Sequence, residues 1–154
     1  MKADGFRALS VRAGSAADVE HLVTLDPVAG SDGGERRAAI QRWCRDGAVL
    51  VADTPTGLVG YCVVEYTFFE QGFVTMLMVA EPARGHGVGE RLLRAAAASC
   101  RTGKLFTSTN LSNHPMQRLL ERIGWRSVGM VHGLDDGDPE VFYLCRSAGT
   151  AGEA

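Results

Sequence analysis

The sequence lacks any apolar run near the ~18–20 residues that a membrane-spanning helix needs. The segment Met1–Ser10 also lacks the apolar stretch of a secretory signal peptide. The formal net charge is −2, so the chain as a whole offers no basic surface for nucleic acid or for an anionic membrane. These absences predict a cytoplasmic protein that has no membrane partner and for which nucleic acid is not the expected ligand.

Cysteine is sparse and scattered, with no Cys-x-x-Cys pair to hold a metal or a redox disulfide. The histidines share no ligand spacing with the cysteines, so we expect no metal site. The sequence around Cys62 and Cys145 is apolar, which is typical of buried thiols. We therefore predict buried, free thiols at all four positions, which are Cys44, Cys62, Cys100 and Cys145.

The chain is long enough for one domain with a hydrophobic core, and too short for two of ordinary size. Its 154 residues contain no repeat and no low-complexity linker, so residues 1–154 are predicted to form a single domain. Small and polar residues at both ends predict short flexible segments at about residues 1–5 and 147–154.

Hydrophobic periodicity alternates along the chain between the patterns of strands and helices. Strands are predicted at Phe6–Arg12, Ala48–Ala52, Leu58–Phe68, Phe73–Ala80, Lys104–Thr109, Arg126–His132 and Glu140–Cys145. Helices are predicted from the N-cap Ser15 through Leu25, and at Glu35–Arg45, Val88–Cys100 and Asn113–Ile123, with a loop at Asp26–Gly34 and Gly124 as the C′ residue of the last helix. This order predicts an α/β fold (an α+β mixed sheet) whose central strands form an antiparallel meander, with helices on both faces.

The segment Arg84–Gly89, with the sequence R-G-H-G-V-G, lies between a predicted strand and a predicted helix. Glycines at such a junction let the backbone approach a ligand closely, and the helix start adds unpaired N–H groups and a positive dipole end. These features suit a pyrophosphate, and Arg84 adds a fixed positive charge. The pattern alone is equally consistent with a plain glycine-rich turn.

Two common phosphate-binding motifs do not match this loop. A Walker loop ends in Gly-Lys-Ser/Thr, whereas Gly89 is followed by Glu90 and Arg91. A Rossmann fingerprint has the spacing G-x-G-x-x-G and an acidic residue about twenty positions later. Here the spacing is G-x-G-x-G, and the later positions are Thr109 and Asn110.

The remaining pattern, Arg-x-x-Gly-x-Gly, resembles the coenzyme A signature of the GNAT superfamily of acyl-CoA N-acyltransferases. A second block, Asn113–Trp125, resembles the Asn-led helix of that family, which ends in Gly-aromatic. The resemblance covers roughly residues 47–145, and residues 8–46 match more loosely. It implies a GNAT-like fold with a mostly antiparallel, twisted sheet of about seven strands. It also implies direct transfer of an acetyl group from acetyl-CoA to a primary amine of a small molecule or peptide, in a ternary complex. Homodimers are common in the family.

The same resemblance assigns residues to the coenzyme. The main chain of Arg84, Gly85, His86, Gly87, Val88 and Gly89 would hold the pyrophosphate, and Leu77, Met78 and Val79 would pair with the pantetheine arm. A backbone N–H near Val79 would polarise the thioester carbonyl. Asn113 matches the Asn that many relatives place near the thiol, although an Asn at this position is also a favoured helix N-cap.

One position departs from the family pattern. Many relatives have a Tyr seven residues after this Asn, as general acid for the leaving thiolate, whereas this chain has Leu120. Another group replaces the acid, or the thiolate leaves unaided, or the chemistry differs. The catalytic candidates are Glu65, His132 and Tyr143, and further polar residues nearby are Ser112, His114 and Glu70, each of which also has an ordinary structural interpretation.

Two charged segments leave alternatives open. The acidic stretch Gly133–Glu140 is either a solvated hairpin or a negative rim that attracts a cationic acceptor. The helix Glu35–Arg45 has a basic face, formed by Arg36, Arg37, Arg42 and Arg45, for which solvation is the default. With Arg118, Arg122 and Arg126, that face would contact RNA if the donor were an aminoacyl-tRNA. A third possibility is a non-catalytic domain that binds coenzyme A.

Overall fold

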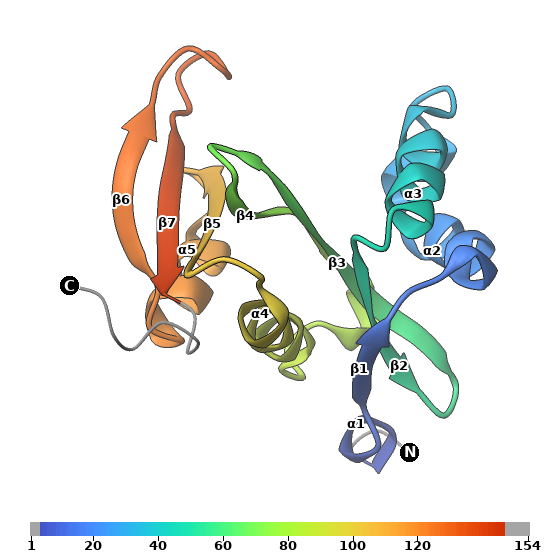
Figure 1. Cartoon of the computed structure of the whole chain (residues 1–154). Coiled ribbons are helices and arrows are strands. Elements are labelled where there is room, and N and C mark those ends of the chain that lie inside the picture. The colour runs from blue at the N-terminus through green and yellow to red at the C-terminus, as the bar shows by residue number, and fades with distance from the viewer. Residues whose placement is uncertain (1–3, 147–154) are drawn as a thin grey trace. The chain divides into compact units, whose positions relative to one another are not determined.

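The computed structural model describes residues 4–146, with Asp4 described by its backbone alone. Its seven-stranded sheet has the order β1-β2-β3-β4-β5-β7-β6. Figure 1 labels the strands, which are β1 (Ser10–Ala13), β2 (Val49–Thr54), β3 (Gly57–Phe68), β4 (Gln71–Val79), β5 (Lys104–Asn110), β6 (Arg126–Val131) and β7 (Glu140–Arg146).

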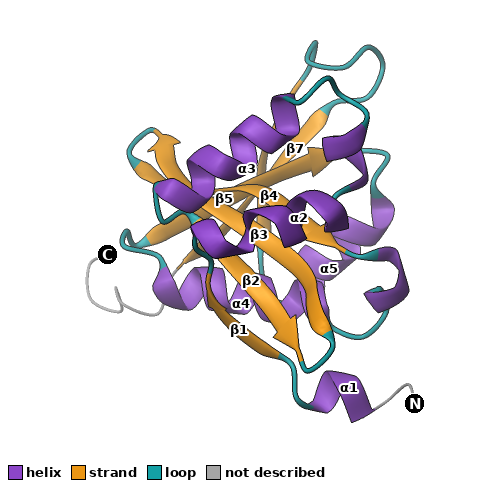
Figure 2. Ribbon diagram, turned by 90° about the vertical axis from the view of Figure 1, so that its right-hand side faces the viewer, coloured by secondary structure: helices purple, strands orange, loops and turns teal. Residues whose placement is uncertain are grey.

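Five α-helices are described, and three 3₁₀ turns join or precede them (Figure 2). The α-helices are α1 (Asp4–Arg7), α2 (Val19–Leu25), α3 (Glu35–Arg45), α4 (Val88–Ser99) and α5 (His114–Arg122), and the 3₁₀ turns are η1 (Ala16–Asp18), η2 (Pro27–Gly30) and η3 (Glu81–Ala83). Within residues 4–146, every helix is too short or too polar to cross a membrane.

The sheet is mixed and mostly antiparallel, as predicted. Antiparallel pairing joins β1 to β2, β2 to β3, β5 to β7 and β6 to β7. The strands β3 and β4 are neighbours connected by only two residues, which requires a hairpin. The parallel pair is β4 with β5, and its register runs from Gly72 opposite Leu105 to Val74 opposite Thr107. The predicted α/β class and element order are therefore confirmed.

Several element boundaries differ from the prediction. Phe6 and Arg7 belong to α1 and not to a strand, and the first strand begins only at Ser10. The predicted loop Asp26–Gly34 contains the turn η2, because Pro27 supplies a fixed φ at a helix start and the Asp26 side chain accepts from the Val28 N–H at 3.0 Å. Asp4 and Gly5, predicted to be flexible, lie in α1, whereas the rest of the two predicted flexible ends falls outside the described residues.

The contacts divide the described chain into two compact units. Unit 1 comprises the residues up to Val64 together with Met76–Ala96, and unit 2 comprises Glu65–Thr75 together with the residues from Ala97 onward. The strands β3 and β4 each contribute residues to both units. The single domain therefore remains a prediction, and each unit is described by itself.

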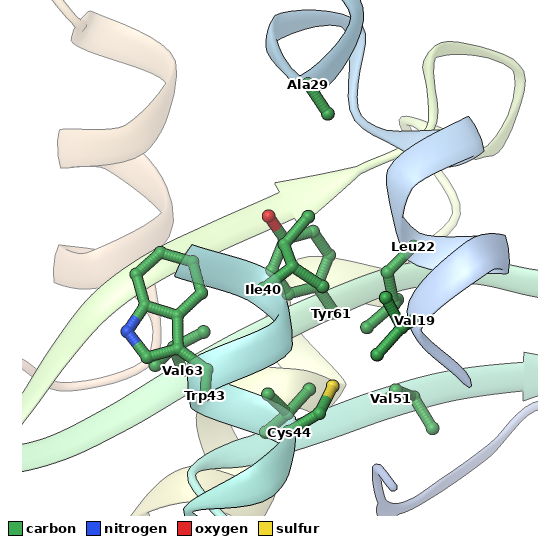
Figure 3. Close-up of a cluster of buried hydrophobic side chains, with 10 residues drawn as sticks. Val19, Leu22, Ala29, Ile40, Trp43, Cys44, Val51, Tyr61 and Val63 are labelled. Carbon is green, nitrogen blue, oxygen red and sulfur yellow. The ribbon is translucent and has the colours of Figure 1, made fainter. Parts of the chain in front are cut away.

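The core of unit 1 lies between the helix pair α2–α3 and one face of β2 and β3. Figure 3 shows Ile40 and Trp43 of α3 beside Tyr61 of β3, with Leu22 of α2 nearby. The strand residues on this face alternate with residues on the other face, as the pairs Val51–Tyr61 and Val49–Val63 show. Burial of these apolar side chains is the main source of stability for α2 and α3.

The helix α4 packs on the opposite face of the same strands, so unit 1 has helices on both faces of its sheet (Figure 2). A side chain at Gly60 would approach the Met78 carbonyl oxygen within 2.8 Å and the Val88 side chain within 3.2 Å. Glycine at this position therefore lets the start of α4 lie close to β3 and β4.

A buried ionic cluster joins η2, α3 and β3 in unit 1. The Asp26 carboxylate accepts from the Tyr61 hydroxyl and from the Arg36 guanidinium, both at 2.7 Å, and its side chain is fully buried. Burial alone would raise the pKa of Asp26, but the hydrogen bonds from Tyr61 and Arg36 outweigh it and lower that pKa. The cluster fixes the connection between α2 and α3.

In unit 2, α5 packs against the strand pair β5–β7 and ends as predicted. Gly124 has φ +94°, and the N–H groups of Gly124 and Trp125 donate to the carbonyls of Glu121 and Leu120. These are the two hydrogen bonds of a Schellman motif, which satisfies the last helical carbonyls. Leu120 is fully buried, as the predicted apolar stripe requires.

The four cysteines are free. Cys44 and Cys62 are buried, and burial raises the pKa of both thiols, that of Cys62 to about 12. Cys100 and Cys145 are only half-buried, so the prediction of four buried thiols holds for two of them.

Candidate active site

The loop between β4 and α4 has the backbone that a phosphate cradle needs. Gly85 and Gly87 have φ of +80° and +79°, and no atom would contact a Cβ at either position. Glycine is therefore required for conformation and not for space, since other residues avoid this region. Arg84, Gly85, His86 and Gly87 are all exposed, so this backbone is accessible to a ligand.

The start of α4 adds donors next to this loop. The first hydrogen bond into the helix runs from the Arg91 N–H to the Gly87 carbonyl at 3.1 Å. The N–H groups of Val88, Gly89 and Glu90 therefore lie ahead of the intrahelical ladder. Gly87 occupies the N-cap position but has no side chain to cap these donors, which leaves them for an anion.

Arg84 is held against the end of β4. Its Nε donates to the Val79 carbonyl at 3.3 Å, so the guanidinium lies beside the residues predicted to pair with pantetheine. The register of β4 with β5 extends only over Gly72–Val74, whereas β4 continues to Val79. The backbone of Leu77, Met78 and Val79 thus lies beyond that ladder, as required for pairing with an extended ligand.

His86 makes a specific side-chain contact within unit 1. Its imidazole stacks on the ring of Phe6 in α1, with the ring centroids 4.1 Å apart and an interplanar angle of 5°. The side chain is therefore occupied by α1, and what His86 offers a ligand at this position is its backbone N–H. No local pattern predicts this contact, because the segment that contains Phe6 is predicted to be a strand.

Asn113 in unit 2 is the N-cap of α5. Its Oδ1 accepts from the Met116 N–H at 3.2 Å, and the residue is exposed. The structural interpretation of Asn113 is thus correct, and its side-chain amide group remains available as a donor. Contact of Asn113 with coenzyme A stays a prediction.

The three catalytic candidates lie in different surroundings of unit 2. Glu65 in β3 is half-buried and accepts from the Thr75 hydroxyl at 2.8 Å. His132 follows β6 and is exposed. Tyr143 is almost fully buried, and burial together with the nearby Glu121 carboxylate raises its pKa. This environment supports the packing interpretation of Tyr143, since a general acid must reach the reacting atoms.

Of the further candidates, Ser112 has a partner that sequence reasoning missed. Its hydroxyl and its N–H donate to the Asp138 carboxylate at 2.6 and 3.0 Å. His114 and Glu70 are exposed. Asn110 donates to Asp135 at 2.9 Å, so two aspartates of the acidic segment Gly133–Glu140 are fixed to the end of β5. These hydrogen bonds join residues that lie far apart in sequence, so they could be identified only from the three-dimensional structure.

The basic face of α3 is largely engaged in contacts within unit 1. Arg36 pairs with the buried Asp26, and Arg37 pairs with Glu20 at 2.7 Å. The Arg42 guanidinium lies 5.8 Å from the Trp43 ring centroid. These contacts reduce the charge that α3 could offer to a polyanion.

The chain resembles known proteins both in sequence and in structure. A family model described as the acetyltransferase (GNAT) family matches residues 17–125. A search of curated proteins gives no significant match.

Solved structures share the fold over nearly the whole chain. A GNAT-family acetyltransferase of Bacillus cereus is 27% identical, with a TM-score of 0.84 over 90% of this chain and 97% of that one. YncA of Salmonella typhimurium, solved with its cofactor acetyl-CoA, is 17% identical, with a TM-score of 0.76 over 96% and 98%. NAA60 of Arabidopsis thaliana, in complex with a bisubstrate analogue, is 15% identical, with a TM-score of 0.71 over 90% and 97%. With the family model matching well over half of its residues, the chain belongs to the acetyltransferase (GNAT) family.

Proposed function

We propose that the protein is an N-acetyltransferase that moves the acetyl group of acetyl-CoA to a primary amine of a small molecule or peptide. The observation that carries this proposal is the exposed loop at Gly85 and Gly87, with left-handed backbone directly before the uncapped start of α4. Such a backbone supplies N–H donors and a positive helix end for a pyrophosphate. Membership of the acetyltransferase family supports the thioester donor.

The proposed reaction is aminolysis of a thioester. The neutral amine nitrogen attacks the carbonyl carbon, the C–N bond forms, and the C–S bond breaks to release coenzyme A as thiolate. The nitrogen loses one proton, which Glu65 or His132 accepts directly or through water. A backbone N–H near Val79 polarises the carbonyl oxygen.

The absence of the usual tyrosine acid defines the protonation step. Leu120 is fully buried in unit 2, so the position has no proton to donate. The thiolate is a weak base, since an ordinary thiol has a pKa of ~8.5. We propose that it leaves without a dedicated side-chain acid and takes its proton from solvent.

The test is release of free thiol from acetyl-CoA across a panel of amines that includes aminoglycosides, polyamines, aryl amines and peptides. Time-dependent release that requires an amine supports the proposal, and mass spectrometry of the product identifies the acetylated atom. Binding of acetyl-CoA without turnover of any amine would assign the chain to the non-catalytic alternative. The aminoacyl-tRNA alternative predicts a salt-sensitive gel shift with tRNA and no heat of binding with acetyl-CoA.

A further inference from the structure

The strand β6 in unit 2 is an exposed edge of the sheet. It is the last strand in the sheet order and pairs with β7 on one side, so its outer backbone N–H and C=O groups face away from the sheet (Figure 1). All six of its residues, Arg126–Val131, are exposed. An edge of this kind can accept a further strand by backbone pairing.

The side chains of β6 favour such pairing. The strand contains no lysine, no proline and no carboxylate, which are residues that often protect an edge. It exposes three large apolar side chains instead, with Val128 at 47%, Met130 at 46% and Val131 at 42%. The other edge strand, β1, has four residues and exposes no large apolar side chain. Exposed apolar residues gathered on one element mark an interaction surface.

Gly129 lies in the middle of β6, and nothing in the described chain requires a glycine there. Its φ is not in the left-handed region, and a Cβ at this position would meet no atom within 4 Å. Its pairing with β7 is irregular, since Val128 is an extra residue in the register, but a bulge without left-handed backbone does not need glycine. Glycine in a strand interior also marks a place where another backbone approaches closely.

A second copy of β6 fits this edge in one antiparallel register. Arg126 and Val131 pair with residues on one face of β7, whereas Ser127 and Met130 pair with residues on the other face. A two-fold axis that places Arg126 opposite Val131 also places Ser127 opposite Met130. Both pairs then join residues of the same face, as antiparallel pairing requires.

The centre of this register accounts for the glycine. There, Val128 of each copy lies opposite Gly129 of the other. The missing side chain leaves room for the valine, so the two backbones can approach to pairing distance. The extra residue in the pairing with β7 thus has an apolar contact across the two-fold axis.

Charge selects the antiparallel arrangement. Val131 is in register with Glu140 of β7, so Arg126 of one copy and Glu140 of the other lie on the same face, two strand spacings or ~10 Å apart. The two long side chains can span this distance over Val131. Within residues 4–146, neither Arg126 nor Glu140 belongs to an ion pair. A parallel pairing would instead bring the two Arg126 side chains together.

We propose that β6 is a homodimer interface, in which the β6 strands of two copies pair antiparallel with Arg126 opposite Val131. The interface is isologous, so the contact between Arg126 and Glu140 forms twice. A single pair of strands buries little surface, and we expect a dissociation constant in the micromolar range. Dimer formation requires neither coenzyme nor acceptor and is independent of the proposed function.

The first test is sedimentation velocity of the full chain from low micromolar to submillimolar concentration. The wild type is expected to show a concentration-dependent equilibrium of monomer and dimer, and Gly129→Val to remain monomeric because the new side chain collides with Val128 of the second copy. The thermal midpoint of Gly129→Val should not fall, since valine favours a strand. Gly30→Val is the matched control, because Gly30 also lacks a positive φ and has open space, and it should dimerise as the wild type does.

The second test exchanges the charges and does not depend on the glycine variant. Arg126→Glu and Glu140→Arg should each raise the dissociation constant of the homodimer about 10-fold or more, because each variant brings like charges together twice. An equimolar mixture of the two variants should recover the dimer, since both contacts between the unlike copies are then attractive. This recovery also shows that the variants are folded.

Three results overturn the proposal. They are a wild type that stays monomeric over the whole concentration range, a Gly129→Val variant that dimerises as the wild type does, and a mixture of the charge variants with no more dimer than either variant alone. A wild-type dimer that withstands both tests would be formed by another surface.

Discussion

Phe6 and His86 form a stacked pair that connects the first helix to the glycine loop, with ring centroids 4.1 Å apart. The residues are far apart in sequence, and both lie in unit 1. Because Gly85 and Gly87 on either side of His86 have no side chain, the stack is a side-chain anchor for this part of the loop. The pair therefore stabilises the backbone that we propose binds pyrophosphate.

Phe6→Ala is expected to weaken acetyl-CoA binding by about 2- to 12-fold, which corresponds to the loss of one aromatic pair. Titration calorimetry measures the dissociation constant, and Met130→Ala, at an exposed position of β6, is the control. In a His86→Ala background the same substitution should add little, since the contact is already lost. An unchanged dissociation constant in the single variant would show that the stack does not support the loop.

Gly85→Ala tests the backbone requirement of the loop. A Cβ at this position meets open space, but φ of +80° is unfavourable for alanine, so we expect the loop to change conformation and acetyl-CoA affinity to fall more than about 10-fold. Gly137→Ala is a matched control, because Gly137 also has a positive φ of +73° and open space, in the acidic segment of unit 2. The two variants should lose similar thermal stability, and only Gly85→Ala should lose affinity. Equal affinities would remove the loop from the binding site.

The buried Asp26 predicts a dependence of stability on pH. Its pKa is lowered in the folded state, so the unfolded chain binds more protons as the pH falls below the ordinary value of ~3.9. The contribution of Asp26 is complete above that value and is lost as the pH falls through the folded-state pKa. Asp26→Asn should destabilise the protein by about 3–5 kcal/mol at neutral pH, since it leaves Arg36 without its buried partner.

Urea unfolding at pH 7, 5 and 3 measures both effects. The free energy of unfolding of Asp26→Asn should fall less between pH 5 and pH 3 than that of the wild type. Asp46→Asn serves as the control, because its ion pair with Arg45 is exposed and long, at 3.7 Å. A variant with the same acid sensitivity as the wild type would assign that sensitivity to other carboxylates.

The acidic segment predicts an effect on the acceptor alone. Replacing Asp135, Asp136 and Glu140 by amides should raise the acceptor KM several-fold without altering the dissociation constant of acetyl-CoA, because a negative rim attracts a cation. Asp136→Asn alone should still raise the acceptor KM, by less than the triple substitution does. Asp135 already accepts a hydrogen bond from Asn110, which leaves Asp136 freer to attract a cation. Steady-state kinetics at low and high salt check this, and a KM that is unchanged at low salt would make the segment a plain solvated hairpin.

The local pattern of the sequence was sufficient for most elements of the fold. Glu35–Arg45 and the cap residues Asn113 and Gly124 were correct because apolar spacing and capping chemistry act within one helix. Phe6–Arg12 was wrong in its first residues, because α1 has four residues and its Phe6 packs against a distant loop. Secondary-structure propensity reflects only neighbouring residues, so it cannot predict a contact between residues this far apart in sequence.

The glycine loop could be predicted from sequence, since left-handed backbone before a helix requires the residue type itself. The partners of charged residues could not be predicted from the sequence. Arg36 belonged to a face expected to be solvated, yet it pairs with buried Asp26, and the pairing depends on how η2 and α3 pack on β3. The ring contacts of Phe68 with Phe73, Phe106 and Phe142 likewise depend on strand register, which the separate apolar runs do not encode.

Calorimetric titration with acetyl-CoA and with S-acetylpantetheine, which lacks the pyrophosphate, tests the central claim most directly. The account predicts saturable binding of acetyl-CoA and an affinity for S-acetylpantetheine that is lower by a factor of at least about 100. The reason is that S-acetylpantetheine lacks the phosphates that accept several charge-assisted hydrogen bonds from the loop. Equal affinity for the two compounds, or no binding of acetyl-CoA, would contradict it.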